Sequence, residues 1–181
     1  SNKVLPERGR IGIFNRSYYE EVLVVRVHPE FLERQKIPQK DLGHHFWEKR
    51  FEQINNFEKY LVDNGIIVLK FFLNVSKAEQ KRRFLERINL PEKNWKFSAN
   101  DLKERAFWDD YMNAYEALFN QTSTPSAPWY IIPADHKWFT HLAVGTVICH
   151  HLESLNLKYP SVSEELKQQL LVAKKSLENE Q

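Results

Sequence analysis

The sequence has little cysteine and almost no net charge. Its single cysteine, Cys149, excludes an internal disulfide and is typical of a reducing compartment. Lys and Arg number 26 against 24 Asp and Glu, so the net charge is only +2 and the molecule has no global field for polyanions. Any anion site in this chain must therefore be local.

Long hydrophobic runs are also absent. No apolar run approaches the roughly 18 residues that a membrane-spanning helix needs, and no signal peptide is visible, so we expect a cytoplasmic protein without a membrane partner. With 181 residues and 42% hydrophobic content, one domain with a sizeable core is the natural expectation.

Glycine is scarce as well, and its positions matter. A phosphate loop of the form G-x-x-x-x-G-K uses glycines to bring backbone N–H groups onto phosphates. None of the five glycines builds this pattern; they are Gly9, Gly12, Gly43, Gly65 and Gly145. We therefore expect the chain to lack such a loop.

Positive charge is concentrated in the stretch Asn74–Tyr111. Seven Lys and Arg stand against three Glu before Phe97, and the sequence then turns acidic and aromatic. Ser76 and Glu79 form a capping-box pattern, which predicts a helix from there through Ile88 and a stop near Pro91.

The spacing in this helix separates apolar from basic residues. Arg83 and Arg87 fall together on one half, where we expect them to be free to face a ligand. The other half carries the apolar residues Val75, Ala78, Phe84, Leu85 and Ile88. Lys77 and Lys81 lie nearer the apolar border. An exposed amphipathic helix without a ligand explains the same pattern.

Basic residues continue beyond this helix. Lys93 and Lys96 flank Trp95 in a short loop, and Ser98 with Asp101 predicts the start of a second helix. Two helices joined by a basic loop make a plausible lid.

The rest of the chain alternates strand and helix patterns. Expected strands are Ile11–Phe14, Ile66–Leu73 and Trp129–Ile132; expected helices cover 15–27, 46–62, 102–119, 135–155 (capped by Asp135) and a charged tail, 163–181. Strands separated by helices predict parallel pairing in an α/β layered fold.

Four ordered motifs resemble the type 2 polyphosphate kinase family. The first is RGRIGIFNRSYYEEVLVVRVHPE at residues 8–30, which is similar to the family's second nucleotide-site motif. The second joins Lys77, Gln80, Arg83, Phe84 and Arg87 to P-x-K-x-W-K at residues 91–96. The third joins S-x-x-D-x-x-x-R at 98–105 to W-D-x-Y at 108–111, and the fourth is TSTPSAPWYIIPADHKWF at 122–139. The likeness covers roughly residues 5–155.

The resemblance implies a specific architecture. The family has an α/β fold of P-loop kinase, thymidylate-kinase-like type: a three-layer parallel sheet with helices on both faces and a helical lid. Here we expect an incomplete domain at 1–158 that lacks the N-terminal strand and P-loop, with a lid segment at about 76–105, followed by a charged C-terminal helix at 159–181.

The resemblance also implies a reaction. Family members transfer a phosphoryl group between inorganic polyphosphate and AMP or ADP, with magnesium bridging phosphates, and the resemblance implies a homo-oligomer. Arg83 and Arg87 are the expected catalytic guanidinium groups, because their forks match phosphate oxygens. Lys77, Lys81, Lys93 and Lys96 are expected to bind the phosphate chain.

Two further groups are candidate site residues. Asn15 and Arg16 follow an expected strand, where the family orders magnesium and phosphate; Asn15 would instead, or also, cap the next helix. Asp101, Arg105 and Asp109 recur every four residues, which predicts either an exposed ion-pair ladder or a ligand contact by Arg105 with both carboxylates holding it. The resemblance favours the second and adds Asp109 as a substrate-binding residue.

Three functions stay open at this point. The chain is part of a complete kinase and is impaired alone for lack of the P-loop, or it is a truncated homologue that binds polyphosphate or nucleotide without catalysis. A nucleic-acid-binding domain built on the basic helix and Trp95 is disfavoured, because the basic cluster is local and no nucleic-acid motif is present.

Overall fold

The structure is a computed structural model that describes residues 5–37, 43 and 45–180. The chain forms two compact units, the first ending at His141 and the second beginning at Leu142. Each unit is described by itself.

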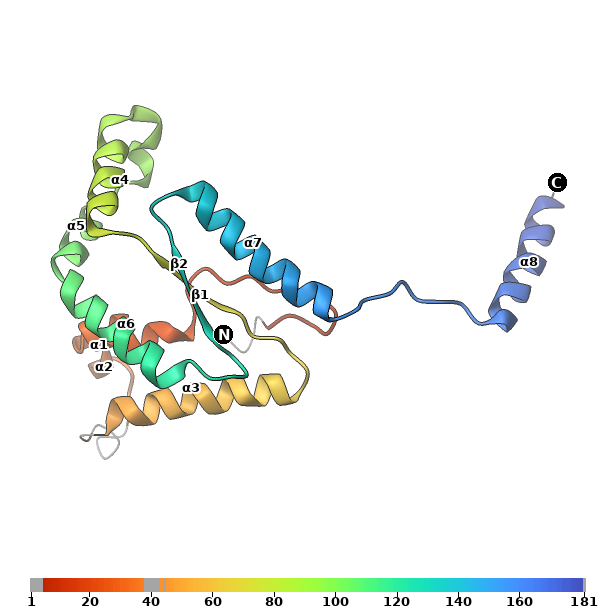
Figure 1. The fold of residues 1–181 in the computed structure, drawn as a ribbon, viewed down its shortest axis with the longest axis horizontal. Helices are drawn as coiled ribbons and strands as arrows, with labels where there is room; N and C mark the ends of the chain where they lie inside the picture. Colours follow the sequence, from red (N-terminus) through yellow and green to blue (C-terminus); the bar gives the residue numbers. More distant parts are fainter. Residues whose placement is uncertain (1–4, 38–42, 44, 181) are drawn as a thin grey trace. The chain divides into compact units, whose positions relative to one another are not determined.

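The first unit is built on two parallel strands, β1 (Lys70–Asn74) and β2 (Trp129–Pro133) (Figure 1). Their register pairs Lys70 with Trp129 and Asn74 with Pro133. The predicted strand at 129–132 is confirmed. The one predicted at 66–73 is confirmed only in its second half, since pairing begins at Lys70.

Several helices and two 3-10 turns make up the rest of the first unit. They are η2 (Tyr18–Val22), α1 (Val24–Val27), α2 (Glu30–Glu33), α3 (Phe46–Asp63), α4 (Lys77–Asn89), η4 (Pro91–Lys96), α5 (Ala99–Ala106) and α6 (Trp108–Thr122). Helix α7 (Lys137–Ser154) begins in the first unit and continues into the second, which also contains α8 (Glu164–Glu178).

Two predictions about elements are wrong, and a third, the helix at 15–27, is only partly confirmed, because Leu23 separates the 3-10 turn η2 from α1. Ile11–Phe14 has no strand pairing, and Ile11 and Ile13 are 72% and 89% exposed. A strand requires a neighbour for its backbone groups, and among the described residues this segment has none. The single helix expected at 102–119 is two helices, because Phe107 (ψ 23°) leaves helical geometry between α5 and α6.

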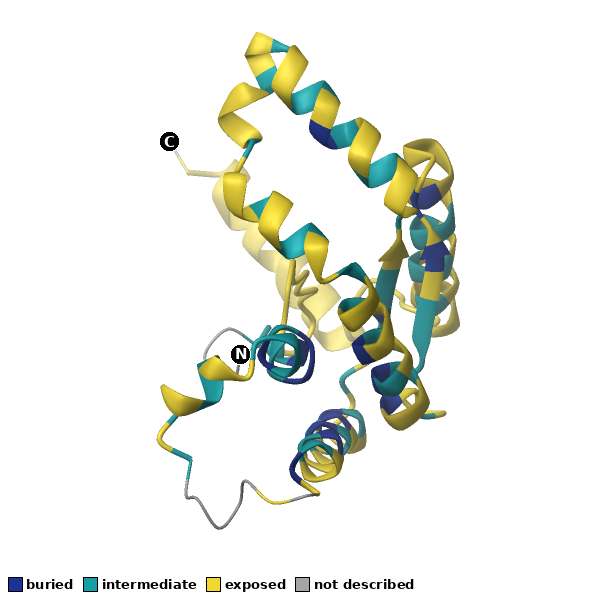
Figure 2. Ribbon diagram, turned by 90° about the vertical axis from the view of Figure 1, so that its left-hand side faces the viewer, coloured by how far each residue is buried: buried dark blue, intermediate teal, exposed yellow. Residues whose placement is uncertain are grey.

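The core lies on one face of the sheet. Buried residues of η2, α3 and α6 form one cluster, shown dark blue in Figure 2: Tyr19, Val22, Leu23, Phe51, Ile54, Ala114 and Leu118. The Phe72 ring of β1 lies 4.3 Å from Tyr115 and 5.2 Å from Phe119, both on α6. Helices α3 and α6 therefore cover the face of β1 that carries Lys70 and Phe72.

The lid segment is far more exposed than this core (Figure 2). Among the described residues of α4 only Phe84 is buried, while Leu85 and Ile88 are 48% and 47% exposed. The predicted apolar half of the helix is thus only partly buried, because α4 packs against η4 rather than across the sheet.

The second unit ends in the helix that the charged tail predicts. Ser163 caps α8 by accepting a hydrogen bond from the Leu166 N–H. Leu166, Leu170 and Val172 are exposed. In the part of the chain that the structure describes, no helix has the length and apolar character needed to cross a membrane.

Candidate functional site

The carboxyl ends of β1 and β2 carry the start of the lid segment and the turn before α7. The Ala134 N–H donates to Asn74 O at 3.0 Å, and the Ser76 N–H donates to Asp135 Oδ1 at 2.7 Å. Asp135 thus holds the entry to α4, a contact that differs from the expected helix cap. Two loops distant in sequence are tied together at the sheet edge where open α/β folds place ligands.

The N-terminus of α4 has one half of the predicted capping box, since Asp135 and not Glu79 accepts from the Ser76 N–H. Ser76 Oγ accepts from the Glu79 N–H at 3.0 Å, which satisfies one of the N–H groups that a helix start leaves unpaired. Glu79 in turn binds Arg82 and Arg83, and hydrogen bonds from Arg82 first and Arg83 second lower the pKa of Glu79 to about 2.

Arg83 is not free, contrary to the expectation from its helical face. Its Nε donates to Glu79, and its Nη2 donates to Ala134 O at 2.7 Å and to Asp135 O at 3.1 Å. The helical-wheel argument could not foresee this, because the carbonyl acceptors lie about 50 residues further along the chain. Arg83 therefore fastens α4 to the turn after β2.

Arg105 is also anchored, but not by the carboxylates expected. Its Nη1 donates to Lys77 O at 2.9 Å and to Gln80 Oε1 at 2.7 Å, so it ties α5 to the first turn of α4. Arg105 and Lys77 both lie over the Trp108 ring, at 5.9 and 5.8 Å from its centroid. The prediction that Asp101 and Asp109 hold Arg105 in place is wrong, since its acceptors lie on Lys77 and Gln80.

Asp101 faces a different arginine. Its Oδ2 lies 3.7 Å from Arg87 Nη1, which is a long ion pair between two half-exposed side chains. Asp109 is exposed on α6. Pairs of this kind contribute about 0 to 1 kcal/mol, so Arg87 can exchange Asp101 for another anion at little cost.

The lysines of the lid segment lie at its surface. Lys77, Lys81 and Lys96 are exposed, and Lys96 Nζ lies 4.8 Å from the centroid of the Trp95 ring. Lys93 forms an ion pair with Glu86, and the hydrogen bond from Lys93 lowers the pKa of that carboxyl. Three of the four predicted phosphate-binding lysines are thus open to solvent.

Asn15 and Arg16 are exposed beside η2, and Arg16 has a positive φ of 70°. Arg16 pairs with Glu20, and the predicted capping role belongs to Ser17, whose Oγ accepts from the Tyr19 N–H at 3.3 Å. Burial raises the pKa of Tyr115 on α6, Glu20 raises it further, and Arg16 opposes this, so Arg16 lies within electrostatic reach of α6.

The described residues offer little to hold magnesium without substrate. In the ranges 5–37 and 45–180 no group of three or more His, Cys, Asp or Glu side chains is placed to bind a metal. Asn15 supplies one neutral amide oxygen. This fits magnesium only where phosphates and water complete its octahedral shell, which is its usual habit in phosphate-transfer sites.

Sequence reasoning missed a buried polar network beneath the sheet. Lys70 Nζ donates to Glu58 Oε2 at 2.6 Å, to Thr122 O at 2.8 Å and to Tyr19 OH at 3.0 Å. Tyr18 and Tyr19 both donate to Glu58 Oε1. Burial lowers the pKa of Lys70 although Glu58 opposes this, and burial, reinforced by Glu58, raises the pKa of both tyrosines.

One signal could have revealed this network. Lys70 interrupts an otherwise apolar run from Ile66 to Leu73, and a lysine in a buried strand requires a partner. All three N–H groups of Lys70 have acceptors, so the network is a structural element rather than a reactive one.

A second junction joins the lid segment to the segment before α2. His28 Nε2 lies 2.8 Å from Glu104 Oε2, and Tyr111 OH donates to the same oxygen at 2.8 Å. Burial alone would raise the pKa of Glu104, but hydrogen bonds from Tyr111 and His28 lower it overall. The ring of Phe107, the residue between α5 and α6, packs on the His28 ring with 4.8 Å between the centroids.

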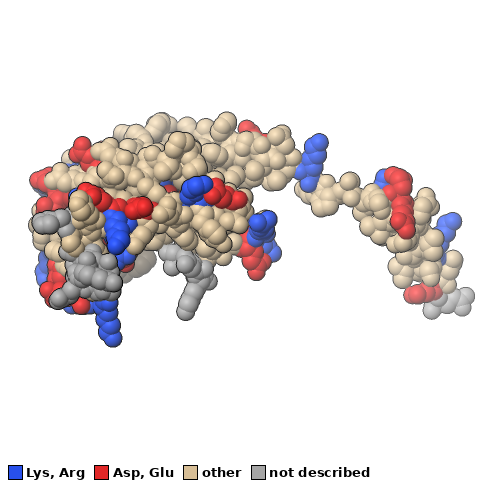
Figure 3. Space-filling model, turned by 90° about the horizontal axis from the view of Figure 1, so that it is seen from below, with Lys and Arg blue, Asp and Glu red and all other residues tan. Residues whose placement is uncertain are grey.

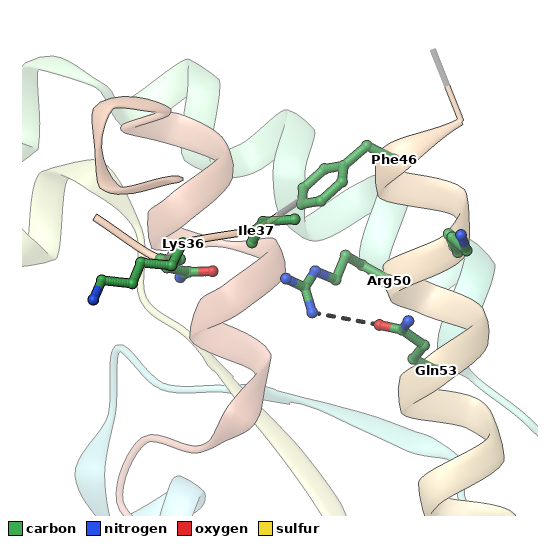
Figure 4. A pocket seen from close by; sticks show the side chains of 7 residues that line it. Lys36, Ile37, Phe46, Arg50 and Gln53 are labelled. Carbon is green, nitrogen blue, oxygen red and sulfur yellow. Dashed lines mark hydrogen bonds between the residues drawn. The ribbon is translucent and has the colours of Figure 1, made fainter. Parts of the chain in front are cut away.

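One depression on the first unit lies away from these residues (Figure 4). It has a volume of about 350 Å³ and is lined by Gln35, Lys36, Ile37, Phe46, Lys49, Arg50 and Gln53. Arg50 lies over the Phe46 ring and donates to Gln53, as the close-up shows. None of the candidate site residues lines it, so we do not assign the site there.

Fold and site together define a class: an α/β protein with a basic helical segment fastened at the carboxyl ends of parallel strands, where such folds place ligands. The chain belongs to the polyphosphate kinase 2 family, whose sequence model, described as Polyphosphate kinase 2 (PPK2), matches residues 2–160.

Named relatives and a solved structure agree. The chain is 52% identical over 174 residues to an ADP-polyphosphate phosphotransferase of Rhodopseudomonas palustris, covering 96% of this chain and 60% of the relative. It is 46% identical over 156 residues to an AMP/ADP-polyphosphate phosphotransferase of Meiothermus ruber, covering 86% of this chain and 54% of that one.

The crystal structure of Polyphosphate Kinase 2 from Arthrobacter aurescens TC1 matches with a TM-score of 0.83 and 39% identity, over 95% of this chain and 58% of that one. The chain therefore spans about 60% or less of the length of these relatives.

Proposed function

We propose that the protein acts in phosphoryl transfer between inorganic polyphosphate and AMP or ADP, forming ADP or ATP. The observation that carries this proposal is the fastening of the basic helix α4 to the carboxyl ends of β1 and β2 by Arg83 and Asp135, with Arg105 tying α5 to α4. The names of the relatives supply the substrates.

Phosphoryl transfer requires positive charge on the non-bridging oxygens, an in-line geometry and exclusion of water. In this proposal Arg83 and Arg87 meet the reacting phosphates. The contacts of Arg83 among the described residues use Nε and Nη2, so Nη1 stays available to a phosphate oxygen. Arg87 reaches the phosphates by releasing Asp101.

The remaining basic residues act along the phosphate chain. Lys77, Lys81, Lys93 and Lys96 supply point charges on the lid segment, and Arg105 positions Lys77 through its backbone carbonyl. Asp109, which is exposed in the first turn of α6, is the proposed substrate contact from that helix. Trp95 carries Lys96 over its ring, which places that ammonium at the exposed loop.

Asn15 and Arg16 complete the proposed site. Magnesium would enter with the substrate phosphates and neutralise their charge, and Asn15 would contribute one ligand, directly or through water. Arg16, which is exposed, would contact phosphate after leaving Glu20. The same proposal includes a three-layer fold, with helices on both faces of a parallel sheet, and a homo-oligomer.

A second candidate function follows from the glycines. No glycine of the sequence belongs to a G-x-x-x-x-G-K loop. The alternative is therefore a module that binds polyphosphate or nucleotide and is impaired in turnover.

Calorimetric titration with polyphosphate tests both candidates. We expect Arg87→Ala to weaken binding about tenfold, since a charge-assisted hydrogen bond contributes about 1.5 to 3 kcal/mol. Arg50→Ala, in the remote depression of Figure 4, is the matched control and leaves affinity unchanged. Unaltered binding by Arg87→Ala would contradict the site.

Turnover then separates the two candidates. Formation of ADP or ATP from polyphosphate with AMP or ADP, with magnesium present, identifies a phosphotransferase. Tight binding without turnover identifies the module, and displacement of polyphosphate by RNA at equal charge concentration would favour a nucleic-acid domain instead.

A further inference from the structure

The lid segment returns to the core where α5 meets α6 beside α1 (Figure 1). This is the second junction, formed by His28, Glu104, Phe107 and Tyr111. The Tyr111 hydroxyl of α6 donates to Glu104 Oε2 of α5 across the break at Phe107, and His28 Nε2 lies 2.8 Å from the same oxygen. One carboxylate oxygen thus joins three parts of the chain: α5, α6 and the segment between α1 and α2.

The His28 side chain is only 13% exposed and has a carboxylate near each ring nitrogen. Nε2 faces Glu104 of α5, and Nδ1 lies 3.3 Å from Glu30 Oε1 of α2. Its ring packs on Phe107, and its centroid lies 6.4 Å from that of Tyr111 on α6. Among the described residues, the charged or titratable groups that face His28 are therefore Glu30, Glu104 and Tyr111.

Two carboxylates around one imidazole require two protons. A neutral imidazole has a single N–H, so its other nitrogen turns a lone pair toward a carboxylate oxygen. The imidazolium has an N–H on each nitrogen, so it donates to Glu104 and at the same time attracts Glu30. The full set of contacts in the second junction therefore belongs to the protonated His28 side chain.

The other polar groups of this junction are held in one protonation state. Burial would raise the pKa of Glu104, but hydrogen bonds from Tyr111 and His28 lower it overall, so Glu104 stays a carboxylate. Burial, reinforced by Glu104, raises the pKa of Tyr111 although Arg16 opposes this, so Tyr111 stays a donor. Histidine is the side-chain type here that ordinarily changes its charge between about pH 5 and 8.

The second junction continues into the first turn of α4. Arg105 follows Glu104 directly, and its Nη1 donates to Lys77 O at 2.9 Å and to Gln80 Oε1 at 2.7 Å. The Arg105 guanidinium and the Lys77 ammonium both lie over the ring of Trp108, the first residue of α6. A shift of the last turn of α5 against α6 therefore moves Lys77, one of the proposed phosphate contacts.

We propose that His28 is a positioning residue for the lid segment: in its protonated form it holds Glu104 and thereby fixes α5 and Lys77, and loss of the proton releases α5. The inference rests on the proposed function only for the role of Lys77, since the junction itself needs neither polyphosphate nor nucleotide. The lid segment is then held more firmly in mildly acidic than in mildly alkaline solution.

Hydrogen exchange of the full chain without any ligand tests this. Protection factors of the α5 amides at residues 103–106 are compared at about pH 5.5 and about pH 8.5, which bracket the range in which histidine changes its charge. We expect them to fall at least about threefold at the higher pH, as the loss of a half-exposed ion pair allows. Amides in the middle of α3 should change by less than that factor.

Two variants separate positioning from packing. His28→Gln keeps an N–H for Glu104 but cannot take up a proton, so its α5 protection should no longer depend on pH. The matched control is His45→Gln, which removes another histidine paired with a glutamate, His45 with Glu48 at 2.6 Å. It should keep the pH response of the parent chain.

Nitrogen NMR of the parent chain provides a check that depends on no variant. We expect two N–H groups on the His28 ring at about pH 5.5 and one at about pH 8.5, with the change following the loss of α5 protection. A ring with a single N–H at the lower pH would overturn the proposal, as would an equal pH response of α5 in His28→Gln and the parent chain. Because no phosphate takes part, either result leaves the phosphotransferase proposal to its own titration.

Discussion

At the residue scale, the Lys70–Glu58 pair shows how a charge is kept inside this fold. Both side chains are almost fully buried, at 5% and 2% exposed, and every N–H of Lys70 has an acceptor. Such a pair adds little stability compared with apolar packing, but breaking it leaves an uncompensated charge.

Lys70→Met should therefore destabilise the first unit by about 3 to 5 kcal/mol, because it strands the Glu58 carboxylate in the core. Glu58→Gln in the same chain removes that charge and keeps an oxygen for Tyr18 and Tyr19, so the double variant should be more stable than Lys70→Met alone. Urea unfolding measures both. A double variant less stable than either single one would contradict this account.

Glu79 makes the stability of the lid segment depend on pH in the acid range. Its pKa falls from 4.5 to about 2 because Arg82 and Arg83 donate to it. The folded pKa lies below the unfolded value, so its contribution to stability is present above pH 4.5 and is lost as the pH falls toward 2.

We expect the thermal midpoint to fall less steeply between pH 4.5 and 2 in Glu79→Gln than in the parent chain. Carboxyl NMR gives the direct check, since the Glu79 resonance should titrate near pH 2. A resonance that titrates near 4.5 would show that the arginines do not hold the carboxylate in solution.

At the element scale, predictions succeeded where the signal is local. Ser76 and Ser98 each cap a helix as predicted, because a cap depends on the next three residues. The strand predicted at Ile11–Phe14 does not form, because strand pairing depends on a distant partner. The prediction of a free Arg83 side chain was wrong for the same reason, since its acceptors lie on the turn after β2.

Ser76→Ala should cost about 1 kcal/mol of local stability at the start of α4, since it removes the acceptor for the Glu79 N–H. Hydrogen exchange of the α4 amides measures this directly. Ser163→Ala is the matched control, because it removes the equivalent cap from α8 and should leave α4 exchange unchanged. Equal exchange of α4 in both variants would show that Asp135 alone sets the entry to the lid segment.

At the scale of the whole molecule, charge is balanced and only locally organised. Lys and Arg lie interspersed with Asp and Glu on the face shown in Figure 3, in keeping with the net charge of +2. The sequence was sufficient to predict the basic stretch and the family. It could not predict which of its arginines are already bound within the fold, because that depends on carbonyls brought close only by folding.

The two units make a last prediction possible. Residues 164–178 form α8, all of whose described residues are exposed, and the family match ends at residue 160. Residues 161–180 therefore include no buried side chain. On removal of residues 161–181 the free energy of unfolding of the first unit should change by less than about 0.5 kcal/mol, the range of surface changes that touch no packed feature.

Urea unfolding of the shortened chain, followed by near-ultraviolet circular dichroism of the tryptophans, checks this, because all five lie at or before Trp138. The control variant Leu118→Ala should lower the free energy of unfolding by about 2 to 5 kcal/mol, because this side chain of α6 is fully buried in the cluster with η2 and α3. A comparable loss on removing the tail would show that the exposed Leu166 and Leu170 are covered in solution, by this chain or by another copy.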